Sequence, residues 1–239
     1  MMIVAIHQPQ FMPWLGYLDK MDRCDVFVFL DTVQYKKNEY QNRNRIKTAH
    51  GWQWLTVPTH YKFPQKINEV PVDNSNNWRT KHLHALLTNY GKSPFYKKYI
   101  EQFSELYEQD WHLLSEVNMA SVILLKDLLG IRAETVIASA LDGVRDDPSQ
   151  RLVDICVRLG ADTYLSGTDG IKYMDVGMFR DAGINVTFQE FHHPVYTQMF
   201  NSFELYMSVI DLLFNCGEQS MDIIRKGAAL EFAGNRSAS

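Results

Sequence analysis

The chain has 239 residues, of which 46% are hydrophobic and 13% aromatic, and its formal net charge is -4. This length and composition suffice for a hydrophobic core and exclude a disordered chain. The negative charge gives no general attraction for polyanions, so we expect no binding of genomic nucleic acid.

Cys24, Cys156 and Cys216 are isolated in the sequence, without the paired spacing of a disulfide frame or a zinc site. This pattern favours reduced thiols and a cytoplasmic location. The amino terminus has no basic start before a long apolar run, and no stretch of about 18 apolar residues occurs. We therefore expect neither a secretion signal nor a membrane span.

Residues 2–6 form an apolar run rich in β-branched side chains, which is typical of a strand buried on both faces. The segment from His7 to Trp14 contains Pro9 and Pro13, and the two prolines exclude regular structure there. A helix is predicted directly after this segment. Ligands bind beyond the carboxyl ends of parallel strands, so a His-Gln loop at this point is a candidate site. The alternative is an ordinary connecting loop with a hydrogen-bonded histidine.

Residues 25–30 give a second buried-strand pattern that ends at Asp31. Strand, helix and strand within thirty residues predict a right-handed βαβ unit with two parallel neighbours. Asp31 is then expected close to the His7 loop. There it could orient His7 or bind a sugar hydroxyl.

A locally basic segment follows, and residues 43–48 and 52–58 predict a β-hairpin. Arg43 and Arg45 project to one side of the first arm, where guanidinium groups could bind a diphosphate. Trp52 and Trp54 on the second arm would supply a stacking surface for a base or a sugar ring. A solvated strand with its apolar side in the core is the alternative. A short strand is also possible within residues 67–72.

Apolar spacing then predicts three successive helices at residues 78–90, 95–108 and 110–129. They indicate a helical subdomain, residues 77–130, inserted in a single α/β domain that covers residues 1–239. The α/β pattern resumes with strands at 134–138, 161–165 and 185–189 and helices at 147–160 and 176–182. A final helix is predicted at residues 203–214.

The loop that begins Ser166-Gly167-Thr168 follows a predicted strand and could bind an anion through its backbone amides, with Lys172 as the charge partner. It lacks the spacing of standard phosphate loops, and a plain tight turn is equally compatible. His192 and Tyr196 follow the last predicted strand. All these residues should meet His7 and Asp31 along one edge of the sheet. His192 and its neighbouring histidine lack a third ligand at metal-binding spacing, so no metal site is expected. We expect no cofactor either.

The motifs together resemble the WbqC-like protein family. They are His7-Gln8-Pro9, Pro13-Trp14, Gly16-Tyr17, Lys20, Asp31, Gln34, Asn42-Arg43-Asn44, residues 54–58, residues 164–167 and Tyr196. The family occurs among bacterial O-antigen and other surface-polysaccharide genes, such as those for lipopolysaccharide. The resemblance therefore implies a cytoplasmic enzyme that acts on a nucleotide-linked sugar. The most concrete reaction that the resemblance implies is transfer of an acyl or aminoacyl group, for example glycyl, to a nucleotide-linked amino sugar. An acyl or aminoacyl donor would supply the group.

Residues 11–18 also resemble the Phe-x-Pro-x-His-x-Gly-His signature of nucleotidylyltransferases. The spacing is one residue short, and Trp14 and Tyr17 stand in place of the histidines. Glycosyl or nucleotidyl transfer in the same pathway, and non-catalytic binding of a sugar nucleotide or glycan, are the alternative functions.

We thus expect a Rossmann-like three-layer α/β fold with a mostly parallel sheet, a β-hairpin and a mostly helical insertion. His7 is the candidate acid or base, with Asp31 as the second candidate catalytic residue. The candidate substrate-binding residues are Gln8, Trp14, Tyr17, Asn42, Arg43, Arg45, Ser166, Gly167, Thr168, Lys172, His192 and Tyr196.

Overall fold

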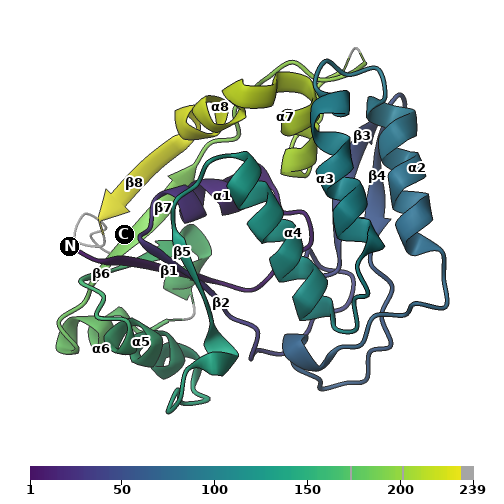
Figure 1. Ribbon diagram of the computed structural model, residues 1–239. Helices are drawn as coiled ribbons and strands as arrows, with labels where there is room; N and C mark the ends of the chain where they lie inside the picture. The colour runs from purple at the N-terminus through teal and green to yellow at the C-terminus, as the bar shows by residue number, and fades with distance from the viewer. Residues whose placement is uncertain (173, 201, 233–239) are drawn as a thin grey trace.

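The computed structural model describes residues 1–172, 174–200 and 202–232 (Figure 1). Its main sheet has the strand order β5-β2-β1-β6-β7-β8. The strands are β1 (Ile3–His7), β2 (Val26–Phe29), β5 (Glu134–Ile137), β6 (Thr163–Gly167), β7 (Asn185–Phe191) and β8 (Ala228–Phe232). Only the pair of β7 and β8 is antiparallel within these described strands. Numbered along the chain, the six strands follow the order 3-2-1-4-5-6 of the Rossmann fold, so the predicted fold class is confirmed.

Eight α-helices are assigned in the described residues. They are α1 (Leu15–Asp22), α2 (Trp78–Tyr90), α3 (Tyr96–Glu108), α4 (Leu114–Leu128), α5 (Pro148–Arg158), α6 (Val176–Asp181), α7 (Val209–Cys216) and α8 (Ser220–Lys226). No helix within these residues is both long and apolar enough to cross a bilayer. Cys24, Cys156 and Cys216 are buried free thiols.

Alternating side chains of β1 build two separate cores on the two faces of the sheet. Val4 and Ile6 pack with α5 and α6, whereas Ala5 belongs to a larger core that includes α1, α4 and α7. Figure 1 shows α5 and α6 together on one side of the sheet and α1 and α4 on the other. Because both faces are covered, β1 and β2 are apolar at nearly every position.

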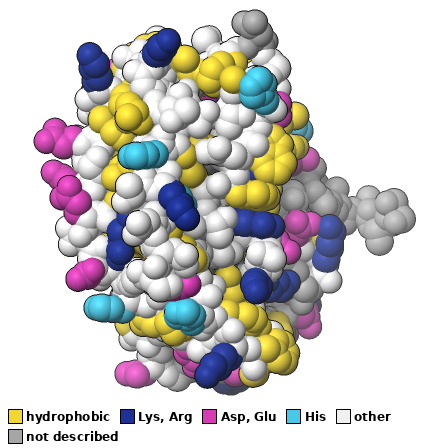
Figure 2. Space-filling view, turned by 90° about the vertical axis from the view of Figure 1, so that its right-hand side faces the viewer, with side chains coloured by type: hydrophobic (Ala, Val, Ile, Leu, Met, Phe, Trp, Pro, Cys, Tyr) yellow, Lys and Arg dark blue, Asp and Glu magenta, His cyan; other side chains and the backbone are white. Residues whose placement is uncertain are grey.

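A long insertion separates β2 from β5 in the chain. It contains the antiparallel hairpin β3 (Arg43–Thr48) and β4 (Gly51–Thr56), followed by α2, α3 and α4. The side of the molecule that carries α2 and the hairpin is shown in Figure 2. In that view Lys and Arg side chains lie among hydrophobic ones, and most Asp and Glu side chains lie toward the margins.

Two sequence predictions about secondary structure were wrong. Residues 67–69 form a 3-10 turn rather than part of a strand. The last predicted helix, 203–214, begins only at Val209, because the Ser208 side chain accepts the Ile210 N–H and caps the helix there. The chain then continues through α8 to β8, a short strand for which no pattern was recognised in the sequence.

The loop between β1 and α1 is held by an unusual clamp on Met12. This residue has a φ of 45°, in the left-handed region that residues other than glycine rarely adopt. Its N–H donates to Ser121 Oγ at 3.1 Å. Its carbonyl accepts from Asn44 Nδ2 at 2.8 Å and from Ser208 Oγ at 2.7 Å. Side chains from α4, β3 and the start of α7 therefore fix this one buried peptide segment.

Asn44→Ala is expected to lower the free energy of unfolding by about 1–3 kcal/mol, because it removes a donor from a buried carbonyl and weakens the clamp on a strained residue. Chemical denaturation monitored by circular dichroism measures this change. The control is Gln53→Ala, at a half-buried position on the same hairpin, which should change the stability by less than about 0.5 kcal/mol. Equal effects of the two substitutions would show that the clamp is not a major constraint.

Candidate functional site

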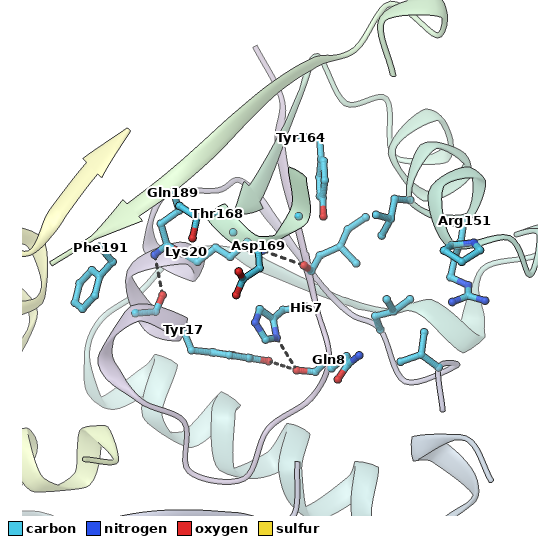
Figure 3. A pocket seen from close by; sticks show the side chains of 18 of the residues that line it. His7, Gln8, Tyr17, Lys20, Arg151, Tyr164, Thr168, Asp169, Gln189 and Phe191 are labelled. Carbon is cyan, nitrogen blue, oxygen red and sulfur yellow. Dashed lines mark hydrogen bonds between the residues drawn. The ribbon is translucent and has the colours of Figure 1, made fainter. Parts of the chain in front are cut away.

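A pocket of about 540 Å³ opens where β1 and β6 separate (Figure 3). The two strands pair only as far as Ala5 and Leu165, although each continues for two more residues. From β1 the chain passes through α1 to β2 on one side, whereas β6, on the other side, is reached from α5. The pocket thus lies at the topological switch point of the sheet, where open α/β folds bind their ligands.

The lining comes from five parts of the fold. His7 and Gln8 come from the end of β1, and Trp14, Tyr17 and Lys20 come from the start and inner face of α1. Gly167, Thr168, Asp169 and Gly170 follow β6, Gln189 and Phe191 lie at the end of β7, and Pro148, Arg151 and Leu152 belong to α5. All of these parts lie near the carboxyl ends of the parallel strands, which is the edge where open α/β sheets bind ligands.

His7 presents a neutral imidazole to the pocket. Its Nδ1 lies 3.0 Å from the carbonyl oxygen of Gln8. A carbonyl can only accept, so Nδ1 carries the proton and Nε2 carries the lone pair. Burial, and secondarily the charge of Lys20, lowers the pKa of His7 to about 3. The ring packs edge-on against Tyr17, with 4.7 Å between centroids.

Two cations line the pocket, and Lys20 is the buried one without a carboxylate partner among the described residues, because Arg151 pairs with Asp146. The Lys20 side chain is only 3% exposed, and Nζ donates to the carbonyl of Ile6 at 3.1 Å. Burial lowers the pKa of Lys20 to about 8, so the ammonium form is still the main one at neutral pH. One acceptor leaves two N–H groups of the ammonium for a ligand.

Gln189 offers an acceptor of fixed orientation. Its Nε2 donates to the carbonyl of Gly16 at 2.8 Å and to Asp19 Oδ2 at 2.5 Å. Both partners can only accept, so the amide cannot be flipped and Oε1 is left as the acceptor end. Asp19 is itself held by Arg23 Nε, at 2.9 Å from Oδ1. Figure 3 shows His7, Lys20 and Gln189 reaching the same space from β1, α1 and β7.

This arrangement can bind a ligand that has both an anionic oxygen and N–H or O–H groups. Lys20 supplies a desolvated positive charge, Gln189 accepts a hydrogen bond, and His7 Nε2 can take a proton. Within the described residues no group of three or more His, Cys, Asp or Glu side chains could hold a metal ion.

The structure brings six of the sequence-derived candidates to the pocket: His7, Gln8, Trp14, Tyr17, Gly167 and Thr168. Asp31 does not orient His7 as we expected. Its carboxylate accepts from the backbone N of Ser139 at 3.0 Å and from Ser139 Oγ at 2.6 Å, which ties β2 to the turn after β5.

Two candidates near the β6 loop are occupied by local contacts. Ser166 is buried, and its hydroxyl donates to the carbonyl of Gly167. Lys172 is exposed and pairs with Asp169 at 2.5 Å. Neither residue is part of the pocket lining in this structure.

The other five candidates also lie outside the pocket lining. Asn42 is buried and donates to the carbonyl of Val57, and Arg43 and Arg45 lie on the hairpin. His192 is exposed. Tyr196 is buried and donates to the carboxylate of Asp211, so its hydroxyl serves the core.

Lys20 and Gln189 were not among the candidate site residues. For Lys20 a signal existed, because a lysine three residues after Tyr17 lies on the same helix face and that face is otherwise apolar. For Gln189 there was none, since its orientation depends on Asp19 and Gly16, which are distant in the chain.

Comparison with known proteins gives one consistent result. A model of the WbqC-like protein family matches residues 8–223. A protein of Mycobacterium tuberculosis with the name "Uncharacterized protein Rv1507c" is 35% identical over 227 residues, which cover 93% of this chain and 97% of the relative. No solved structure matches the chain.

Lys20→Met should raise the free energy of unfolding at pH 7 by roughly 1–3 kcal/mol, because the buried ammonium has a pKa depressed from 10.5 to about 8. The folded chain binds fewer protons than the unfolded chain between these two values. The destabilisation of the wild-type fold by the buried ammonium is therefore complete below pH 8, and it disappears as the pH rises toward 10.5.

Urea denaturation at several pH values measures this gain. Lys37→Met, at an exposed position, is the control and should be neutral at every pH. A destabilised Lys20→Met variant would show that the ammonium does not oppose folding.

Proposed function

This chain belongs to the WbqC-like protein family, and from this premise we propose that it is a transferase of bacterial surface-polysaccharide biosynthesis that acts on a nucleotide-linked sugar. Family membership indicates a role related to polysaccharide synthesis. In the most concrete form of the proposal, an acyl or aminoacyl group, for example glycyl, is transferred to the amine of a nucleotide-linked amino sugar.

The observation that supports this proposal best is the buried His7 beside Lys20 at the switch point of the sheet. Acyl transfer to an amine needs a base that is unprotonated at neutral pH, and burial keeps His7 in that form. As the amine nitrogen bonds to the acyl carbon, Nε2 of His7 takes the proton that the nitrogen loses. The bond from the acyl carbon to the donor breaks, and the donor leaves with the proton.

Lys20 and Gln189 have separate roles in this proposal. The carbonyl oxygen of the acyl group becomes an oxyanion in the tetrahedral intermediate, and the ammonium of Lys20 stabilises it. Gln189 Oε1 accepts a hydrogen bond from an N–H or hydroxyl group of the sugar. This selects a ligand that has a donor at that position, because an analogue without one leaves the amide oxygen unpaired.

Glycosyl or nucleotidyl transfer in the same pathway remains the alternative enzymatic reaction. A second candidate function, non-catalytic binding of a sugar nucleotide or glycan, is favoured by one observation. Trp52 on the hairpin is 42% exposed, and an exposed tryptophan is a suitable surface for a sugar ring or a base.

Mass spectrometry of nucleotide-linked amino sugars, incubated with the full chain and with acyl or aminoacyl donors, tests the transfer. The expected product is the sugar nucleotide with the added acyl mass. His7→Ala should reduce the rate by a factor of about 10² to 10⁴, the usual contribution of a positioned base. His192→Ala, an exposed histidine outside the pocket lining, should leave the rate unchanged.

Circular dichroism of both variants checks that the fold survives. A His7→Ala protein with the rate of the wild type would exclude His7 as the base. A wild-type protein that binds the sugar nucleotide and modifies none would favour the non-catalytic function.

The pH profile gives an independent check, because kcat/KM reports the pKa values of the free enzyme. After correction for the fraction of the acceptor amine that is unprotonated at each pH, kcat/KM should stay level from pH 5 to 7, since His7 with a pKa of about 3 remains neutral there. It should fall as the pH rises through about 8, where Lys20 loses its proton. A decline centred near the ordinary histidine pKa of about 6.5 would contradict the buried neutral base.

A further inference from the structure

A second polar and aromatic surface lies on the hairpin. Arg45 is opposite Trp54 in the β3–β4 register, and Arg43 lies two residues before Arg45 on the same side of β3. The guanidinium carbon of Arg43 is 4.1 Å from the centroid of the Trp54 ring, and that of Arg45 is 5.0 Å from the Trp52 ring. We call Arg43, Arg45, Trp52 and Trp54 the hairpin face.

The two guanidinium groups are partly exposed and have no carboxylate partner among the described residues. Each donates through Nη2 to a backbone carbonyl, that of Asn38 or Tyr206. The Nε atoms of both are buried without a hydrogen-bond partner. Two neighbouring cations without counter-charges favour an anionic ligand.

Tyr206 extends this surface and is held in a costly conformation. Its φ of 60° is in the left-handed region, and its side chain is 49% exposed. The Tyr206 N–H donates to His193 Nε2 at 3.2 Å, and its carbonyl accepts from Arg45 at 3.3 Å. A strained residue that keeps an aromatic ring in solvent is typical of a recognition site.

Aromatic contacts connect the hairpin face to the pocket. The Trp14 ring lines the pocket and lies 6.1 Å from the Tyr206 ring and 5.5 Å from the Phe191 ring, between centroids. Tyr206 is in turn bound to Arg45. A ligand whose reacting end enters the pocket can therefore extend past Trp14 and Tyr206 onto the hairpin.

We propose that the hairpin face binds the nucleoside diphosphate half of the substrate. The phosphates pair with Arg43 and Arg45, and the base stacks on the exposed ring of Trp52. The sugar leads past Trp14 into the pocket. This inference rests on the proposed function for the identity of the ligand. A neutral glycan would use the aromatic rings but not the two unpaired arginines.

Calorimetric titration of the full chain with the diphosphates of uridine, thymidine, cytidine, guanosine and adenosine tests the site without any transfer reaction. At least one should bind. The double variant Arg43→Gln, Arg45→Gln should weaken that binding at least 10-fold, and Lys37→Gln, at an exposed position before the hairpin, should not. Trp52→Leu should weaken binding of the diphosphate and of the free nucleoside but not of pyrophosphate.

Three results would overturn the site. No nucleoside diphosphate binds, the arginine variant binds as tightly as the wild type, or the Lys20→Met substitution is the only one that weakens binding. The last would place the nucleotide in the pocket. The two proposals fail separately. Acyl transfer that is unaffected in the arginine variant rejects only the hairpin site, whereas arginine-dependent binding without transfer rejects only the transferase. Trp52→Leu, at an exposed position, keeps the test decisive if the arginine variant does not fold.

Discussion

The structure depends on the hydrogen bonds that hold the backbone of Met12. Its left-handed conformation is costly for a residue with a side chain, and it persists because Ser121, Asn44 and Ser208 bind both polar groups of its backbone. These three side chains come from α4, β3 and the start of α7. One short loop thereby joins the inserted helices and the hairpin to the Rossmann sheet. The same loop begins at His7 and ends at Trp14, so the clamp also sets where the pocket residues lie.

Buried polar and charged side chains in the pocket lower the stability of the fold. Lys20 is almost fully buried without a carboxylate partner among the described residues, and the pKa values of both Lys20 and His7 are depressed by burial. Asp19, also fully buried, holds Gln189 in one orientation. An apolar core would be more stable at these positions. Such local conflicts with good packing are expected where a fold carries a function.

Trp14 connects the two halves of the proposed substrate path. Its ring lies between Phe191 at the pocket and Tyr206 beside the hairpin. Gly16 makes this position possible, because a Cβ there would come within 2.3 Å of the indole. The unpaired arginines of the hairpin and the lysine of the pocket then form two cationic positions along one path, as an extended ligand with a diphosphate in its middle requires.

The sequence by itself determined most of the architecture. Buried-strand patterns at residues 2–6 and 25–30, the two prolines after His7 and the polar and aromatic hairpin are local signals, and they predicted the Rossmann-like sheet and one wall of its pocket. The partners of single side chains were decided only by the tertiary structure. Asp31 binds Ser139 instead of His7, and Gln189 is oriented by Asp19, because these pairs are 108 and 170 residues apart. The start of α7 at Ser208 and the edge strand β8 depend in the same way on contacts with distant segments, and a local pattern of apolar residues carries no information about those contacts.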